Sequence, residues 1–163
     1  MARLQAELAV NPELQSEPAA GWGYPLMMDG APPLQFVITP EETLIFNTYR
    51  DLRHVYTDGR PHPPEEDRWP TTWGSSVGHW DGDTLITWTS NVQAWKSHSS
   101  FEWSGQLQSI EIYTPMRDAD GKFIGLNHEA ILYDPEALVE PIRIILRLVK
   151  LAEFSDPKVN PIV

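Results

Sequence analysis

The sequence contains no cysteine among its 163 residues. Disulfide bonds, thiolate catalysis, iron–sulfur clusters and cysteine-ligated zinc are therefore excluded. The sequence also lacks any run of about 18 apolar residues, so we expect no membrane-spanning helix. Residues 1–10 lack the apolar core of a secretory signal and include Glu7. From the chain as given we expect a cytoplasmic protein, with a periplasmic one as the alternative if a leader was trimmed.

Positive charge is scarce: 12 Lys and Arg oppose 23 Asp and Glu, which gives a formal net charge of −11. Nucleic acids and membrane surfaces are themselves anionic, and no basic stripe offsets the repulsion, so neither is an expected partner. We expect a small-molecule substrate or ligand as the partner, and the sequence leaves a homodimer open. An anionic substrate would need a local cluster of Arg or His to oppose the overall charge.

Large aromatic and turn-forming residues are abundant, with seven Trp, 15 Pro and ten Gly. Aromatic rings of this size fill a barrel or line a pocket, and Pro and Gly separate short strands. Helix-forming residues at 2–9 predict one short helix. Residues 1–33 are expected to form this helix and an irregular arm, whose Tyr24, Leu26 and Met27 pack against the rest of the chain. Residues 34–163 are expected to form a single β domain.

Alternating polar and apolar residues with turn signals between them predict about eight strands. Asp81-Gly82 predicts a tight hairpin, because the primed turns need positive φ, and Asp120-Gly121 predicts a second turn. The last segment is interpreted as a strand, although its basic spacing would also suit a helix. The expected fold is mainly β, a small antiparallel up-and-down barrel of the lipocalin-like kind, with room for one small ligand. The predicted strands cover residues 34–39, 43–49, 53–58, 75–80, 83–89, 106–113, 123–133 and 142–151.

Two segments resemble a known family. Residues 53–63 read Arg-His-Val-Tyr-Thr-Asp-Gly-Arg-Pro-His-Pro, and residues 74–85 read Gly-Ser-Ser-Val-Gly-His-Trp-Asp-Gly-Asp-Thr-Leu. The pair is similar to a largely uncharacterised bacterial family that combines R-x-[I/V]-Y-x-D-G-R-x-H-P with G-x-S-V-G-x-W-x-G-D-T-L. The likeness covers roughly residues 24–145. It implies an often exported β-barrel protein and, through distant members, a cofactor-independent decarboxylase acting on lignin-type aromatic acids.

The chain departs from this family around the sixth predicted strand. Trp103-Ser104 stands where the family tends to carry His-Ser, and Glu111-Ile112 stands where it tends to carry Glu-Arg. No role of that family His or Arg is therefore carried over to this chain.

An acid–base enzyme for an aromatic acid needs a cation to hold the carboxylate, a proton-transfer group and a dry aromatic wall. Arg53 and Arg60 are candidates for the cation. In the third strand alternation places Arg53 and Val55 on the face opposite to His54 and Tyr56. The candidate proton-transfer residues are Tyr56, His62, His79 and Glu111, and the candidate wall residues are Trp73, Trp80 and Trp88.

Each candidate also has a purely structural interpretation. Asp58-Gly59-Arg60 could be a simple turn, and His79 with Trp80 could be a surface histidine beside a packing tryptophan. If Glu111 points inward, desolvation is expected to raise its pKa and make it an acid; if it points outward, it is solvated. His128-Glu129 lies within a strand, so only one of the two can face the interior.

Motifs for metals and cofactors are missing. The sequence has no H-x-H, no H-E-x-x-H, no glycine-rich loop between a strand and a helix, and no G-x-S-x-G. We therefore expect neither a metal nor a cofactor.

The favoured function is a cofactor-independent acid–base lyase of decarboxylase type for a small aromatic or hydrophobic carboxylic acid. The alternatives are a non-catalytic barrel that binds a hydrophobic small molecule, and a Trp-rich protein-interaction domain. Titratable groups that converge inside the barrel would favour catalysis, and an interior lined only by apolar groups would favour carriage. Tryptophans gathered on a flat outer face would favour the interaction domain.

Overall fold

The computed structural model describes residues 23–29, 33–48, 51–94 and 102–151. Within them the chain forms one eight-stranded sheet whose spatial order follows the sequence. The predicted mainly β class and the number of strands are confirmed. The strands are β1 (Leu34–Ile38), β2 (Glu42–Asn47), β3 (Leu52–Tyr56), β4 (Ser75–Asp81), β5 (Thr84–Ser90), β6 (Gln108–Arg117), β7 (Phe123–Tyr133) and β8 (Ile142–Val149).

One junction differs from the expected up-and-down arrangement. Strands β3 and β4 are parallel, paired through Val55 with Ser76 and Tyr56 with Val77, whereas the other neighbouring strands are antiparallel. Parallel neighbours need a crossover connection instead of a hairpin. Residues 57–74 provide it and include one 3-10 turn, η2 (Glu65–Asp67). The purely antiparallel expectation is wrong at this junction.

The β4–β5 hairpin is confirmed, but its centre lies one residue later than expected. Asp81 pairs with Thr84, so the two central residues are Gly82 and Asp83. Gly82 has a φ of 62°, and Asp83 is not among the residues with positive φ. This pattern is that of a II′ turn, in which only the first central residue needs a positive φ.

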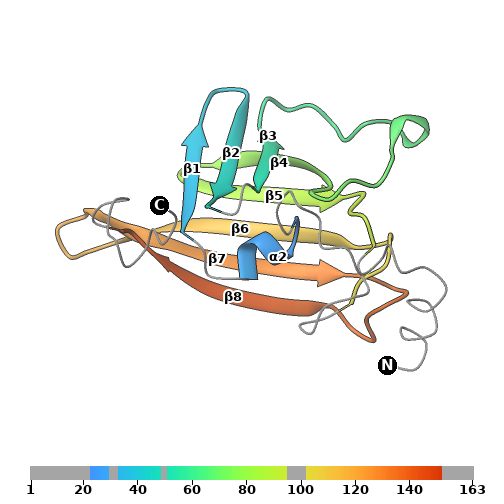
Figure 1. The fold of residues 1–163 in the computed structure, drawn as a ribbon. Helices are drawn as coiled ribbons and strands as arrows, with labels where there is room; N and C mark the ends of the chain where they lie inside the picture. The colour runs from blue at the N-terminus through green and yellow to red at the C-terminus, as the bar shows by residue number, and fades with distance from the viewer. Residues whose placement is uncertain (1–22, 30–32, 49–50, 95–101, 152–163) are drawn as a thin grey trace.

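The sheet is a half-barrel, and β1 and β8, its two ends, do not pair within the described sheet. Full closure was therefore a wrong expectation. Helix α2 (Leu26–Asp29) crosses the concave side of the sheet (Figure 1). Tyr24 and Met27 are buried there, as expected for the arm, together with Ile45, Leu85 and Leu132 from the sheet. The predicted helix at residues 2–9 lies outside the described residues.

The final apolar segment is a strand. In β8 half-buried and exposed residues alternate, so Ile144 and Leu146 face inward while Arg143 and Arg147 face outward. The period of two accounts for the spacing of Arg143 and Arg147, whereas Lys150, the third basic residue of the helix-like pattern, lies just beyond the strand.

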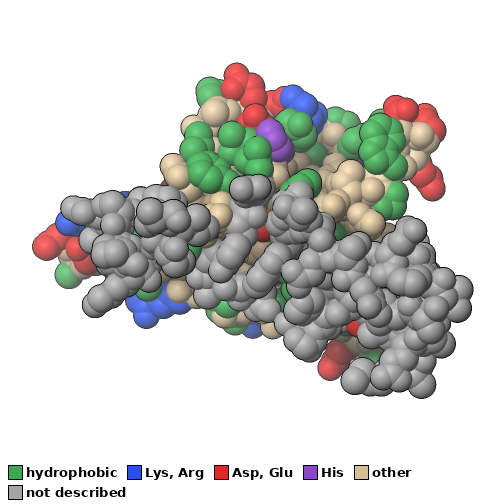
Figure 2. All heavy atoms as spheres, in the orientation of Figure 1, with side chains coloured by type: hydrophobic (Ala, Val, Ile, Leu, Met, Phe, Trp, Pro, Cys, Tyr) green, Lys and Arg blue, Asp and Glu red, His purple; other side chains and the backbone are tan. Residues whose placement is uncertain are grey.

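Many charged side chains lie on the outer surface. In the view of Figure 2, acidic side chains gather on the loop between β3 and β4, where η2 contributes three of them. Of the described helices, none has the length and apolar character needed to cross a membrane.

Candidate functional site

A charged cluster lies inside the half-barrel, at the centre of the concave face. Its two ions are Arg53 from β3 and Glu111 from β6, which are 1% and 0% exposed. The alternation expected for β3 is confirmed, because Arg53 and Val55 are buried while His54 is exposed. The open question about Glu111 is also answered, since its side chain points inward.

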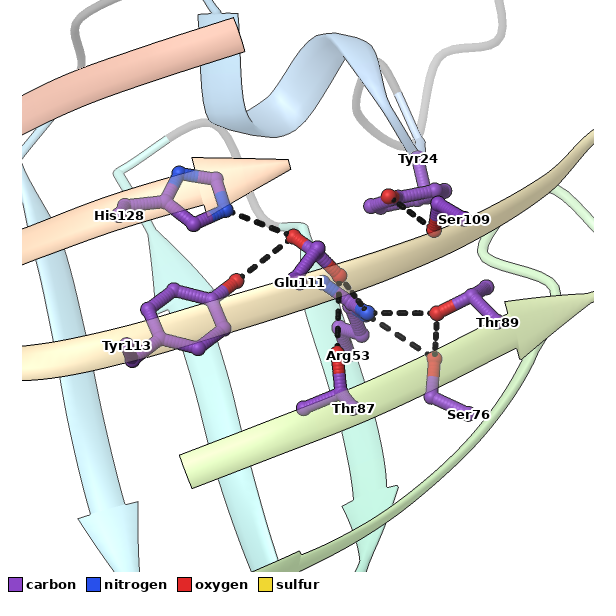
Figure 3. A network of polar contacts seen from close by, with 9 residues as sticks. All are labelled: Tyr24, Arg53, Ser76, Thr87, Thr89, Ser109, Glu111, Tyr113 and His128. Atoms are coloured by element: carbon purple, nitrogen blue, oxygen red, sulfur yellow. Dashed lines mark hydrogen bonds and ion pairs between the residues drawn. The ribbon is translucent and has the colours of Figure 1, made fainter. Parts of the chain in front are cut away.

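Arg53 is held by three strands besides its own (Figure 3). Its Nη2 donates to the Glu111 carboxylate in a direct ion pair and to the Thr89 hydroxyl at 2.7 Å. Its Nε donates to the Ser76 hydroxyl at 3.1 Å. The Thr87 hydroxyl donates to the same carboxylate oxygen of Glu111 at 3.2 Å. Short hydroxyl side chains at inward positions of β4 and β5 therefore satisfy the charges without filling the interior.

The second carboxylate oxygen of Glu111 binds two aromatic groups. The Tyr113 hydroxyl donates to Oε1 at 2.8 Å, and Nε2 of His128 lies 2.9 Å from the same oxygen. The rings of Tyr113 and His128 are stacked, with centroids 4.4 Å apart and planes 7° from parallel. This stacking and the shared oxygen fix the orientation of the imidazole.

The pKa of Glu111 is the reverse of what the sequence predicts. Burial acts to raise it, but the Arg53 charge and the hydrogen bonds from His128 and Arg53 outweigh burial and hold this pKa well below its usual range. Burial and the Glu111 charge raise the pKa of both Tyr24 and Tyr113. The raised pKa expected for an inward-facing Glu111 is therefore wrong: the cluster contains a carboxylate, a guanidinium and neutral phenols.

A small cavity adjoins this cluster on the side of α2. Its volume is about 20 Å³, which is close to the space that one water molecule needs. Apart from Glu111 and His128, the walls are apolar or aromatic. They are formed by Tyr24, Pro25 and Met28 on one side and by Ala130, Ile144 and Leu146 on the other.

Two nitrogen atoms in the cluster have unused hydrogen-bonding capacity. Nη1 of Arg53 and Nδ1 of His128 are buried and have no hydrogen-bond partner among the described residues. In Figure 3 Nδ1 is on the side of the imidazole that faces away from Glu111. Buried polar groups are normally paired, so these two atoms are the places where a bound molecule could supply a partner.

Of the residues singled out from the sequence, the structure places two in the buried cluster, Arg53 and Glu111. Tyr56 lies on the outer face, where its ring contacts the Arg60 guanidinium at 4.1 Å. Arg60 in turn binds Asp58 in an exposed turn, as the structural interpretation had it. His79 is exposed near the end of β4.

The remaining candidates also lie away from the cluster. His62 packs edge-on against Trp88 on the outer face, with ring centroids 4.4 Å apart. Desolvation and the Arg68 charge lower the His62 pKa, so this imidazole is neutral near pH 7. Trp88 and Trp80 are partly exposed, and Trp73 donates to the Asp51 carboxylate at 3.1 Å beside the N-terminal segment.

Sequence reasoning missed most of the cluster. His128 was recognised only as one of an alternating pair, of which Glu129 faces outward and binds Arg143 at 2.6 Å. The register of β6 and β7 is the signal that could have revealed His128. Tyr113 pairs with His128 and Glu111 with Ala130, so Glu111, Tyr113 and His128 all occupy neighbouring inward positions. The other residues that were missed are Tyr24, Ser76, Thr87, Thr89, Ser109 and Tyr113.

No three His, Asp or Glu side chains come close enough to hold a metal ion in the part of the chain that is described. Fold and cluster together define a mainly β half-barrel protein with a charged, hydrogen-bonded interior. No protein-family model, curated protein or solved structure matches the chain.

The ion pair predicts a large penalty for removing one partner. Replacing Arg53 with Met leaves the Glu111 carboxylate buried without its cation, so we expect the free energy of unfolding to fall by about 3–5 kcal/mol. Urea denaturation followed by circular dichroism measures this change. The double variant Arg53→Met/Glu111→Leu removes both charges and is expected to recover part of the loss. An Arg53→Met variant as stable as the wild type would contradict the assignment of a buried ion pair.

The pKa of Glu111 also predicts how stability depends on pH. The pKa of Glu111 in the folded chain is lower than the ordinary value of 4.5. At pH values between these two pKa values, the unfolded chain therefore binds more protons than the folded chain. The stability that the Glu111 carboxylate contributes is present above about pH 4.5 and is lost as the pH falls toward the pKa of Glu111 in the folded chain. We expect the stability of the wild type to fall more steeply below pH 4.5 than that of Arg53→Met/Glu111→Leu, by up to about 1.4 kcal/mol per pH unit. Equal slopes in urea titrations at successive pH values would rule out a depressed pKa.

Proposed function

We propose that this protein is a cofactor-independent acid–base lyase of decarboxylase type. Its substrate would be a small aromatic or hydrophobic carboxylic acid bound between α2 and strands β6 to β8. The observation that carries the proposal is the buried Glu111–His128 pair, at 2.9 Å, on the wall of an otherwise apolar cavity.

The pair supports proton transfer by the same logic as a carboxylate–histidine dyad. A buried carboxylate that accepts a hydrogen bond from one imidazole nitrogen fixes the tautomer and orientation of the ring. The other nitrogen, Nδ1 of His128, is then available to exchange a proton with a bound molecule. Geometry of this kind, with titratable groups converging at a pocket, favours catalysis over carriage.

Arg53 supports a carboxylate ligand. Its Nη2 is engaged by Glu111, but Nη1 is buried with no acceptor among the described residues. A substrate carboxylate that accepts from Nη1 would be held in a poorly hydrated environment, where the neutral product CO₂ is favoured over the charged reactant. The carbon–carbon bond to the carboxyl group would break, CO₂ would leave, and the electron pair would stay on the substrate carbon. That carbon would take the Nδ1 proton of His128 in its imidazolium form, and the neutral imidazole left behind would regain a proton from solvent after release.

A non-catalytic binding protein is the second candidate. Six of the eight residues that line the cavity are apolar or aromatic, and the charge of Arg53 is already balanced by Glu111. Such an interior would hold a hydrophobic guest without chemistry. For either function the cavity of about 20 Å³ is too small for an aromatic acid, so the wall formed by residues 23–29 would have to shift.

The test is to screen benzoate, phenylacetate and cinnamate derivatives for thermal stabilisation and then assay each hit for CO₂ release. We expect His128→Gln to bind a stabilising acid normally but to lower kcat by about 10²–10⁴-fold, the usual contribution of general acid–base catalysis. His54→Gln is the matched control, because His54 is exposed on the outer face and bound to Glu42. Binding without turnover in the wild type would favour the carrier, and stabilisation by none of the acids would count against both functions.

A further inference from the structure

We propose that the site takes a hydroxyphenyl ring in the position held by Tyr24, so that the ligand binds by replacing a side chain of the protein itself. This inference rests on the proposed function for the location of the site and specifies the class of ligand. It is drawn from the contacts of Tyr24, from the way its segment is attached, and from the size of the adjoining cavity.

Tyr24 makes the contacts that a bound phenol would make. Its ring lies over the Arg53 guanidinium at 4.3 Å from the centroid, and its hydroxyl donates to the Ser109 hydroxyl at 2.5 Å. The side chain is 1% exposed. A guanidinium over an aromatic face and a single acceptor for the hydroxyl are together selective for a ring that bears a hydroxyl group.

The segment that carries Tyr24 is not part of the sheet. Three hydrogen bonds join residues 23–29 to the rest of the described chain. The Tyr24 amide donates to the Thr72 carbonyl at 2.9 Å, the Gly23 amide donates to the Asp51 carboxylate at 2.8 Å, and the Tyr24 hydroxyl donates to the Ser109 hydroxyl. Packing of Met27 and Met28 adds to these. The ring is therefore placed by a short element that can move without breaking strand pairing.

The space needed is already partly present. The cavity of about 20 Å³ has Tyr24, Pro25 and Met28 as one wall, while the opposite wall belongs to the sheet. When the Tyr24 side chain leaves, its own volume joins this cavity, and the combined space adjoins Arg53, Ser109 and His128. A hydroxyphenyl ligand would then restore the contacts that Tyr24 gave up and would add its remaining atoms beside His128.

Gly23 provides a way to loosen the segment without touching the site. Its φ is +72°, and a Cβ built there would stand 2.4 Å from the Thr72 carbonyl oxygen. In Gly23→Ala either the segment that holds Tyr24 or Thr72 must therefore shift, which disturbs the hydrogen bond between the Tyr24 amide and the Thr72 carbonyl, while Arg53, Ser109 and His128 are not substituted. Gly121→Ala is the matched control, because Gly121 has a φ of +79° in the β6–β7 turn and nothing within 4 Å.

The experiment titrates the full chain with p-cresol, which is the tyrosine side chain as a free molecule, and with toluene, which lacks the hydroxyl. Binding is measured calorimetrically, and hydrogen exchange is followed at the amides of Tyr24 and Met27. We expect p-cresol to increase exchange at both amides and to bind about tenfold more tightly than toluene, because toluene leaves the Ser109 hydroxyl unpaired. Gly23→Ala is expected to bind p-cresol about tenfold more tightly than the wild type. The reason is that a larger fraction of the free variant already has the Tyr24 segment displaced, so less free energy is needed to open the site. Gly121→Ala is expected to match the wild type.

The remaining outcomes each decide against the inference. Equal affinity for p-cresol and toluene, or a preference that persists in Ser109→Ala, would overturn the assignment of the ring position. Binding of p-cresol that leaves exchange at residues 23–29 unchanged would place the ligand elsewhere. If Gly23→Ala does not fold, these two measurements on the wild type and Ser109→Ala still decide the question. Because p-cresol has no carboxyl group, its binding is independent of whether the chain is a lyase.

Discussion

The ion pair between Arg53 and Glu111 is the constraint on which the interior of this half-barrel depends. Two charges removed from water are tolerated when they are paired and when hydrogen bonds satisfy their remaining polar atoms, and within the described residues Nη1 of Arg53 is the one such atom of the pair without a partner. Here the partners come from five strands, β3 to β7. The pair also links β3 to β6 across the parallel junction with β4, which itself has only two paired positions.

The interior has two different walls. On the sheet side, Glu111 fixes Tyr113 and His128 through one oxygen and Arg53 and Thr87 through the other. On the opposite side, the short segment around α2 contributes only Tyr24, Pro25 and Met28 to the cavity. A charged wall built on paired strands therefore faces an apolar wall that is held by three hydrogen bonds and by core packing.

The sequence predicted the strands well because the signal for a strand is local. Alternation of apolar and polar residues located all eight strands. The turn residues Asp81-Gly82 and Asp120-Gly121 located the β4–β5 and β6–β7 hairpins. The parallel β3–β4 pair was missed because pairing direction across an 18-residue connection, 57–74, leaves no local mark. The cluster was missed for a related reason: Arg53 and Glu111 are 58 residues apart, and only the register of distant strands brings them together. The sign of the Glu111 pKa shift followed from that missed partner, since burial alone would have raised it.

The ion pair and the orientation of His128 both depend on the charge state of Glu111. A ¹³C NMR titration of its side-chain carboxyl, assigned by comparison with Glu111→Gln, reports whether that carboxyl is ionised inside the folded protein. We predict the chemical shift of a carboxylate throughout the range from pH 7 to pH 4, with protonation only at a pH well below the ordinary value of 4.5. A midpoint at or above 4.5 in the folded chain would contradict the ion pair and, with it, the fixed orientation of His128.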